Sequence, residues 1–168
     1  MNTPPKTEVV IVGAGGAGRA LLSWMLAIPE TERDFEPVGF LDENPKALEG
    51  YPCARKWLGK PDDYAFGDNQ RALLAFARPM ARRQVVFDQL KARGVSFFTF
   101  VAPDVMIGMY TDIAEGCVVC PGARISTNAR LEPNVFVNVG SQIGHDCRIG
   151  AHCAIMGNVD IGGGVLIG

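Results

Sequence analysis

Residues 107–168 read IGMYTD, IAEGCV, VCPGAR, ISTNAR, LEPNVF, VNVGSQ, IGHDCR, IGAHCA, IMGNVD, IGGGVL and IG when they are written in rows of six. Every row begins with Ile, Val or Leu, and the fifth place of each complete row holds Thr, Cys, Ala, Val or Ser. A period of six fits neither the 3.6-residue period of a helix nor the two-residue period of a strand. It is the period of a parallel β-helix, in which short strands stack coil upon coil.

Two columns of this repeat have a physical explanation. If three hexads form one triangular coil, each column returns to the same wall about 4.8 Å higher. The aliphatic column then fills the interior, and the small column lies where a larger side chain would collide with the next wall. Residues that tolerate positive φ mark the expected corners: Gly116, Gly122, Asn128, Asn134, Gly140, Gly150 and Asn158. The sequence therefore predicts a β-helix domain at residues 103–168.

The composition is that of an ordinary globular protein, with 48% hydrophobic residues, 20% charged residues and a net charge of -2. This charge provides no basic surface for nucleic acid, and no apolar run has the length of a membrane span. The first residues lack the layout of a signal peptide. Of the five cysteines, Cys117, Cys147 and Cys153 occupy the small column. We interpret them as packed, reduced thiols and expect a cytoplasmic protein.

A glycine-rich turn lies near the N-terminus. The β-branched run at residues 8–12 precedes Gly13, Gly15, Gly16 and Gly18, and an apolar helical pattern follows as far as Pro29. Strand, glycine turn and helix are the context in which glycines let the backbone approach a phosphate, at the positive end of the helix. The same glycines also suit a tight turn without a ligand.

The next strand is expected at residues 37–41 and ends at Asp42 and Glu43. A nucleotide-binding fold places its ribose-reading carboxylate near this point, although solvated loop acids fit equally well. We also expect a short helix after residue 59, strands at 72–77 and 95–101, and a helix at 79–93. The fold class is therefore α/β plus β, with a small Rossmann-like nucleotide-binding domain at residues 1–102 followed by the β-helix.

The chain resembles the NeuD and PglD family of hexapeptide-repeat sugar acetyltransferases. The resemblance covers nearly the whole chain and is carried by residues 13–18, the stretch GFLDENP at 39–45, Leu58-Gly59, Pro103, Ile107-Gly108, and Asn138 followed by GHDCRIG at 144–150. It implies a left-handed β-helix, a homotrimer, and an enzyme that moves an acetyl group from acetyl-CoA to an amino group, or a hydroxyl, of a nucleotide-linked sugar in surface glycan biosynthesis. The nucleotide sugar is expected on the N-terminal domain.

The resemblance also implies residue roles. His145 is the general base and Asp146 polarises it; no metal is expected. Histidine titrates near neutral pH, which suits this task, and the thioester oxygen needs an N–H donor. One coil beyond His145, Gly163 can supply that donor, or it can be a turn former. His152 fits a coenzyme contact or an exposed corner, and Asn138 can face the same cleft as His145.

The chain departs from the family in several places. Ala17 replaces a frequent histidine, Ala102 replaces a histidine before Pro103, and Arg19 replaces a lysine while keeping a charge suited to phosphate. The sequence stops at Gly168 in mid-hexad, so we expect a truncated chain that lacks the last coils and is a poor catalyst.

Three other functions compete with the acetyltransferase interpretation. The first is a non-catalytic, nucleotide-binding trimeric scaffold or regulatory protein. A zinc enzyme of the hexapeptide carbonic anhydrase type requires three histidines, and the chain has two. An NAD-dependent oxidoreductase would require a substrate domain that does not follow the glycine turn.

Overall fold

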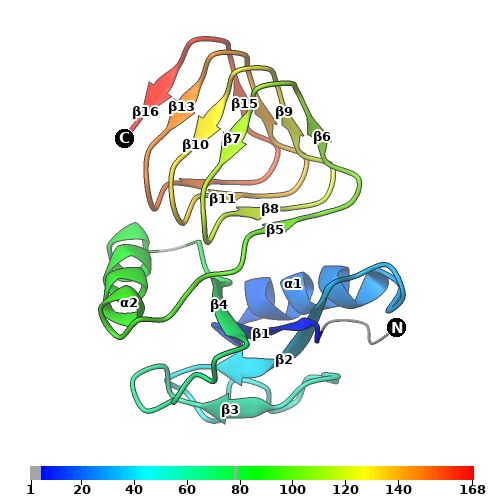
Figure 1. Ribbon diagram of the computed structural model, residues 1–168, viewed down its shortest axis with the longest axis vertical. Coiled ribbons are helices and arrows are strands. Elements are labelled where there is room, and N and C mark those ends of the chain that lie inside the picture. Colours follow the sequence, from blue (N-terminus) through cyan, green and yellow to red (C-terminus); the bar gives the residue numbers. More distant parts are fainter. Residues whose placement is uncertain (1–4, 78) are drawn as a thin grey trace. The chain divides into compact units, whose positions relative to one another are not determined.

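The computed structural model describes residues 5–77 and 79–168. It contains two compact units, one ending at Phe76 and the other beginning at Ala77. The first is a parallel α/β unit and the second is a three-sided parallel β-helix preceded by a helix (Figure 1). The fold class expected from the sequence is confirmed.

The described residues of the first unit, 5–76, form four strands and a helix. They are β1 (Thr7–Val12), α1 (Gly16–Ala27), β2 (Phe35–Leu41), β3 (Trp57–Gly59) and β4 (Gln70–Leu74). The sheet order is β3-β2-β1-β4, and all three pairings are parallel. Strand β1 lies in the middle of the sheet, and its residues 9–12 are buried, as expected for a parallel strand covered on both faces.

Two expectations for this sheet are wrong. Its fourth strand is β3, in a stretch for which the sequence indicated a loop and a helix after residue 59; residues 61–63 form a turn. A three-residue edge strand is too short to show a periodicity. The expected strand at 95–101 is reduced to β5 (Phe100–Val101), which pairs with β8 (Val118–Val119) in the β-helix. The six-residue repeat therefore begins one row earlier than the sequence indicated.

The first element of the second unit is α2 (Met80–Ala92), and Gly94, two residues beyond its end, has a left-handed conformation (φ 80°). Phe87 of α2 stacks on Phe97 with ring centroids 4.1 Å apart. Arg83 is fully buried, its Nε donates to the carbonyl of Asn134 at 3.0 Å, and burial lowers its pKa to about 10. The helix expected at residues 79–93 of the N-terminal domain thus lies in the second unit.

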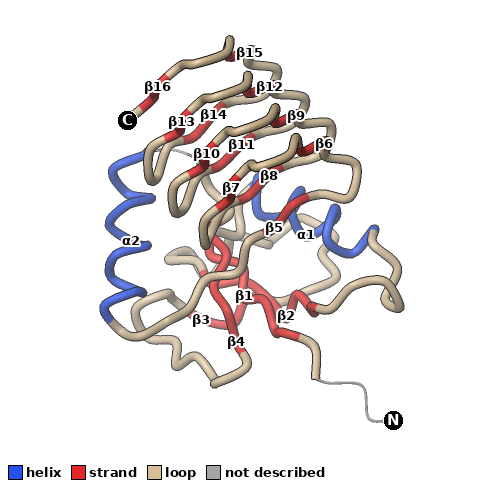
Figure 2. Tube along the Cα trace, turned by 45° about the horizontal axis from the view of Figure 1, so that its top comes forward, coloured by secondary structure: helices blue, strands red, loops and turns tan. Residues whose placement is uncertain are grey.

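The β-helix has three walls, each a four-stranded parallel sheet. The orders are β14-β11-β8-β5, β15-β12-β9-β6 and β16-β13-β10-β7, and Figure 2 shows their two-residue strands stacked in rows. Paired residues are eighteen apart, as between Gln142 and Asp160. The remaining strands are β6 (Met106–Ile107), β7 (Asp112–Ile113), β9 (Arg124–Ile125), β10 (Arg130–Leu131), β11 (Phe136–Val137), β12 (Gln142–Ile143), β13 (Arg148–Ile149), β14 (Ala154–Ile155), β15 (Asp160–Ile161) and β16 (Leu166–Ile167).

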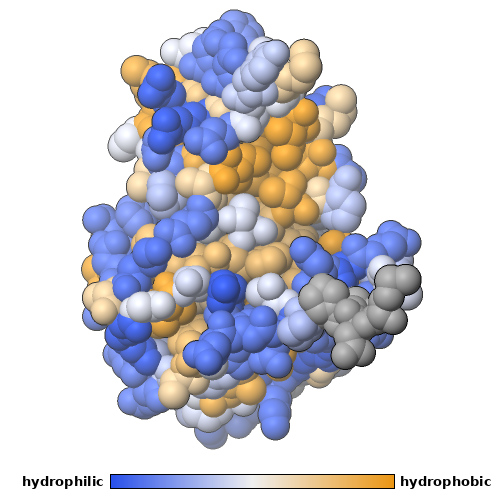
Figure 3. Space-filling model, in the orientation of Figure 1, coloured by the Kyte–Doolittle hydropathy of each residue, from blue (hydrophilic) through white to orange (hydrophobic). Residues whose placement is uncertain are grey.

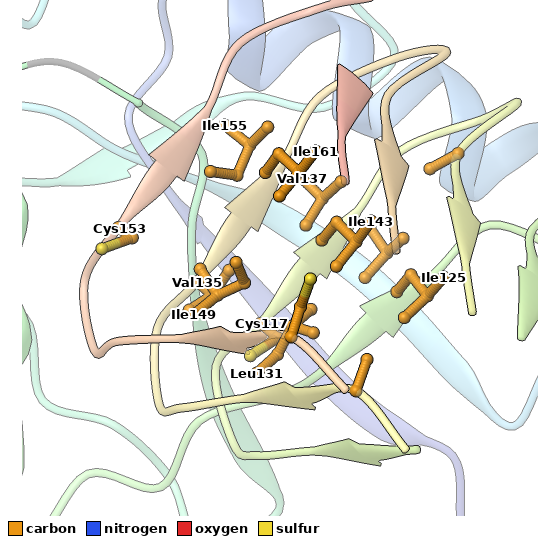
Figure 4. Close-up of a cluster of buried hydrophobic side chains, with 14 residues drawn as sticks. Cys117, Ile125, Leu131, Val135, Val137, Ile143, Ile149, Cys153, Ile155 and Ile161 are labelled. Carbon is orange, nitrogen blue, oxygen red and sulfur yellow. The ribbon is translucent and has the colours of Figure 1, made fainter. Parts of the chain in front are cut away.

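The interior contains the two predicted columns. Aliphatic side chains from all three walls meet in the centre of each coil, with Leu131, Ile143 and Ile149 fully buried (Figure 4). The small column also forms hydrogen bonds. Hydroxyls and thiols of Thr111, Cys117, Ser141 and Cys147 each donate to a backbone carbonyl fifteen residues later, one coil further on. The column therefore ties the coils together as well as leaving room for the next wall.

The corners follow a stricter rule than the sequence indicated. The fourth place of every complete hexad has a positive φ, between 56° and 74°; the residues are Tyr110, Gly116, Gly122, Asn128, Asn134, Gly140, Asp146, His152, Asn158 and Gly164. The expectation for Gly150, which occupies the second place, is wrong. Gly150 is small because a Cβ there would lie 2.9 Å from the Ile167 carbonyl oxygen and from the Gly168 Cα.

The thiol interpretation leads to a labelling prediction. All five cysteines are free, and four of them are buried: Cys117, Cys120, Cys147 and Cys153. Burial raises the pKa of Cys117 to about 11 and that of Cys120 to about 12, so neither forms a reactive thiolate near neutral pH. We expect iodoacetamide to modify only Cys53 in the folded chain and all five after denaturation, as peptide mass mapping can establish. Fast native labelling of Cys147 would contradict the packed core.

Candidate active site

The corner at residues 144–147 connects β12 to β13 and carries His145 and Asp146. It is bonded to both neighbouring coils, because the Asp146 N–H donates to the Thr127 carbonyl at 3.1 Å and the Gly164 N–H donates to the His145 carbonyl at 2.7 Å. Asp146 has a φ of 60°, where glycine or asparagine is the usual residue. The backbone that presents the two side chains is therefore fixed from both sides.

The imidazole and the carboxylate form a pair. His145 Nδ1 lies 2.7 Å from Asp146 Oδ2, and Asn128 Nδ2, one coil away, donates to Asp146 Oδ1 at 3.2 Å. These hydrogen bonds, the one from His145 first and that from Asn128 second, hold the pKa of Asp146 below its usual value. An ionised carboxylate only accepts hydrogen bonds, so Nδ1 carries the proton and Nε2 of the neutral ring is left as the basic atom.

Gly163 lies directly beside the imidazole. A Cβ built on Gly163 would be 2.5 Å from Nε2 and 2.6 Å from Cε1 of His145. The φ of Gly163 is not positive, whereas that of Gly164 is 72°, so Gly164 is the turn former. Gly163 is glycine because any side chain would displace the ring, a role that the sequence did not reveal.

A groove of about 520 Å³ runs along the outer face of the sheet β15-β12-β9-β6. His145 and Gly163 stand at its edge, in the part of the groove formed by the last two coils. Small residues at the start of the adjoining corner lie along it, one from each coil: Gly108, Ser126, Gly144 and Gly162. The outward side chains of the four strands line it as well: Met106, Arg124, Gln142 and Asp160. The volume is that of a small-molecule site.

Close packing between coils requires glycine at two of these small positions. A Cβ on Gly108 would lie 2.4 Å from the Thr127 nitrogen, and one on Gly144 would lie 2.5 Å from the Gly163 nitrogen. Large apolar side chains in the first coil are nevertheless exposed, including Met106, Met109 and Tyr110. Figure 3 shows apolar surface on the β-helix. The groove thus combines exposed glycine backbone with the apolar side chain of Met106 and the charged side chains of Arg124 and Asp160.

Two residues expected near His145 lie at other corners. The Oδ1 of Asn138 accepts the N–H of Val139 at 2.8 Å, in the corner that follows β11. His152 follows β13; its Nδ1 lies 2.9 Å from Asn134 Nδ2 and its ring meets Phe87 edge-on, with centroids 5.3 Å apart. Neither residue lines the groove. Within this chain, His152 packs against α2.

This packing predicts a pH effect on stability. Burial lowers the pKa of His152 below its usual 6.5, with Arg83 adding to the shift and Asp88 opposing it. The packing of the neutral ring therefore contributes its full stability above the pKa that His152 has in the unfolded chain. This stability is lost as the pH falls toward the lower pKa that His152 has in the folded chain. We expect His152→Asn, a residue that tolerates φ 64°, to flatten the decline in urea-unfolding stability below about pH 7. Equal pH dependence in both chains would contradict this role.

In the first unit the glycines of the turn divide into two kinds. Gly13 has a φ of 107°, and a Cβ on Gly18 would lie 1.9 Å from the Gly13 carbonyl oxygen, so both shape the turn itself. Gly15 and Gly16 face open space, where a Cβ would meet nothing within 4 Å. Of the four glycines, only Gly15 and Gly16 are exposed at the surface.

Three further side chains surround this turn. Arg19 Nη1 donates to the Ala14 carbonyl at 3.1 Å, and its guanidinium lies 3.6 Å from the ring centre of Tyr51. Asp42 accepts the Ala14 N–H at 2.8 Å and the Asn44 N–H at 2.9 Å, so its carboxylate ties the turn to the end of β2. Glu43 is exposed. No sequence pattern indicated Tyr51, whose place depends on the loop between β2 and β3.

Two general properties concern the described residues as a whole. No helix among residues 5–77 and 79–168 is long and apolar enough to cross a membrane. No three His, Cys, Asp or Glu side chains of the same residues are grouped so as to hold a metal ion.

Comparison with solved structures shows a shared fold. WeeI from Acinetobacter baumannii matches with a TM-score of 0.77 at 20% identity, over 95% of this chain and 74% of its own. A His-to-Asn variant of perosamine N-acetyltransferase from Caulobacter crescentus, in complex with CoA and GDP-perosamine, matches with a TM-score of 0.77 at 21% identity, over 95% and 73%. The acetyltransferase domain of PglB from Neisseria gonorrhoeae, in complex with acetyl coenzyme A, matches with a TM-score of 0.57 at 19% identity, over 96% and 93%.

Comparisons of the sequence alone found no match. No protein-family profile matches the chain. No curated protein matches it either. The structural likeness nevertheless confirms, at the level of the fold, the resemblance expected from the sequence: an α/β unit followed by a hexapeptide β-helix, as in sugar acetyltransferases.

Proposed function

We propose that this chain is an acetyltransferase that moves an acetyl group from acetyl-CoA to a nucleotide-linked amino sugar. The observation that carries the proposal is the pair of His145 and Asp146 at the edge of a groove, with the ring resting on Gly163. The solved structures of the same fold were obtained with CoA and GDP-perosamine or with acetyl coenzyme A. A base beside a groove is the arrangement that aminolysis of a thioester requires.

The proposed reaction uses the groove residues in order. The acceptor nitrogen attacks the thioester carbonyl carbon, while His145 Nε2 takes the proton that the nitrogen loses. Asp146, held ionised by two hydrogen bonds, stabilises the imidazolium that forms. The Gly163 N–H is the proposed donor to the oxyanion. The carbon–sulfur bond then breaks, and the thiolate of coenzyme A leaves and takes the proton from Nε2.

The N-terminal unit is the proposed holder of the nucleotide. Gly15 and Gly16 leave backbone open at the start of α1, and Arg19 supplies a positive charge beside them. Asp42 and Glu43 lie at the end of β2, where a nucleotide-binding fold reads its ribose.

The chain is proposed to assemble as a homotrimer, which a measurement of its mass in solution can test.

Calorimetric titration and an assay for free thiol test the proposal. We expect one of the UDP-, GDP- and dTDP-linked amino sugars to bind, and acetyl-CoA to release free thiol only when that sugar is present. Binding of a sugar nucleotide without thiol release would instead favour a non-catalytic scaffold. No binding of any sugar nucleotide would contradict the assignment of the glycine turn.

A further inference from the structure

The outward side chains of the groove wall form one column, which contains two charged residues. Met106, Arg124, Gln142 and Asp160 occupy the last place of their hexads and lie directly above one another, because each pairs with the next across the sheet. All four line the groove that also contains His145. Arg124 and Asp160 are thus two coils apart, roughly 10 Å at the usual strand spacing.

On the neighbouring wall, a charged side chain of the same hexad place forms ion pairs. On the sheet β16-β13-β10-β7, Arg130 lies next to Asp112 at 3.9 Å and to Glu132 at 2.8 Å. Among the described residues, neither Arg124 nor Asp160 has an ion-pair partner, since Gln142 separates them. The groove therefore presents a positive side chain and a negative side chain at two separate levels, and both are open to a ligand.

Charge complementarity identifies the ligand. A sugar that carries an amino group and is linked to a phosphate has an ammonium and an anion on opposite sides of one ring. Asp160 belongs to the same coil as Gly163, on which the imidazole rests, so the negative level is the one beside the base. A carboxylate there attracts an ammonium and has no comparable attraction for a hydroxyl.

We propose that Asp160 selects amino over hydroxyl acceptors and that Arg124 contacts the phosphate that bears the sugar. This inference deepens the proposed function, on which it rests, by naming the side chain that selects nitrogen as the acetylated atom. Asp160 acts on recognition of the acceptor, because the ammonium that it holds must lose one proton to solvent before the nitrogen can attack, and His145 then takes the second proton during the attack. Loss of Asp160 is therefore expected to raise KM for the amino sugar without lowering kcat.

The test compares two sugar nucleotides that differ only in an amino or a hydroxyl group at the acceptor position. We expect the unaltered chain to bind the amino compound about five- to tenfold more tightly by calorimetry at low salt, as for a partly exposed charged hydrogen bond. In Asp160→Asn this preference should disappear. In Arg124→Gln both compounds should bind more weakly by the same factor, and acetyl-CoA should bind as before.

Matched controls come from the neighbouring wall. Asp112→Asn and Arg148→Gln change the same hexad place on the sheet β16-β13-β10-β7 and should leave the preference intact. Equal binding of both sugars to the unaltered chain, or a preference that survives Asp160→Asn, would overturn the inference even if acetyl transfer occurs. A change in acetyl-CoA affinity with Arg124→Gln would overturn the phosphate contact. Failure of every sugar nucleotide to bind would overturn the proposed function together with this inference.

Discussion

His145→Gln should lower kcat for acetyl transfer by about 10²- to 10⁴-fold, the usual contribution of a positioned general base. Glutamine has a similar length but no basic atom at the place of Nε2. The side chain of His145 is 64% exposed, so its replacement should leave unfolding stability within about 0.5 kcal/mol of the parent chain. Steady-state kinetics should show the loss in kcat with little change in the affinity for the sugar nucleotide.

The second histidine of the chain provides the control for that variant. His152 lies at another corner and outside the groove, against Phe87. His152→Asn should keep the full turnover at neutral pH. If His145→Gln transfers acetyl groups at the parental rate, His145 is not the base. An equally severe loss with His152→Asn would show that the effect is not specific to His145.

Gly163→Ala should abolish most of the turnover with little loss of stability. The added methyl group would occupy the position of the imidazole, within 2.5 Å of Nε2. The ring is the end of a mobile side chain, so it can turn away at low cost, whereas its alignment with the acceptor is lost. Misplacing a catalytic group by about 1 Å can reduce the rate by about 10²-fold. The measurement is kcat together with the urea-unfolding curve.

Gly157→Ala is the matched control for this variant. Gly157 occupies the same place in its hexad, one wall earlier, but a Cβ there would make ordinary contacts of 3.5 Å with Val139. It does not line the groove. Both variants should unfold at nearly the same urea concentration, and only Gly163→Ala should lose turnover. Retained turnover in Gly163→Ala would show that the ring does not need its present position.

The β-helix could be predicted because its period is visible in single residues. An aliphatic column and a small column recur every six positions, and both reflect the fixed spacing of stacked coils. The corner column could have been found in the same way. Tyr110, Asp146 and His152 stand in the fourth place of their rows beside glycines and asparagines, which identifies them as bulky residues in left-handed turns.

The active-site pair was partly visible in the sequence. His145 and Asp146 were predicted from the resemblance, and the structure places their side chains 2.7 Å apart at the edge of a groove. Asn128 was missed, although it stands eighteen residues before Asp146, one coil away, and the period alone indicates their contact. The role of Gly163 depends on the direction of the His145 ring, which no periodicity reveals.

Other parts could not be predicted because they depend on contacts between distant segments. His152 packs against Phe87, sixty-five positions away in α2, and the intervening sequence carries no signal for that meeting. Strand β3 is too short to show a pattern of its own and forms by pairing with β2. The ligand-reading role of Asp42 stays a prediction, whereas the structure shows that its carboxylate holds the glycine turn through the Ala14 N–H.

Mass spectrometry of the acceptor shows whether this chain transfers acetyl groups through His145. The chain is incubated with acetyl-CoA and each nucleotide-linked amino sugar, beside the same mixtures with His145→Gln. We expect one sugar to gain the mass of a single acetyl group, with the new bond at nitrogen, and this product nearly to vanish with the variant. An acetylated product formed equally by His145→Gln, or no product from any sugar that the chain binds, would contradict an acetyltransferase centred on His145.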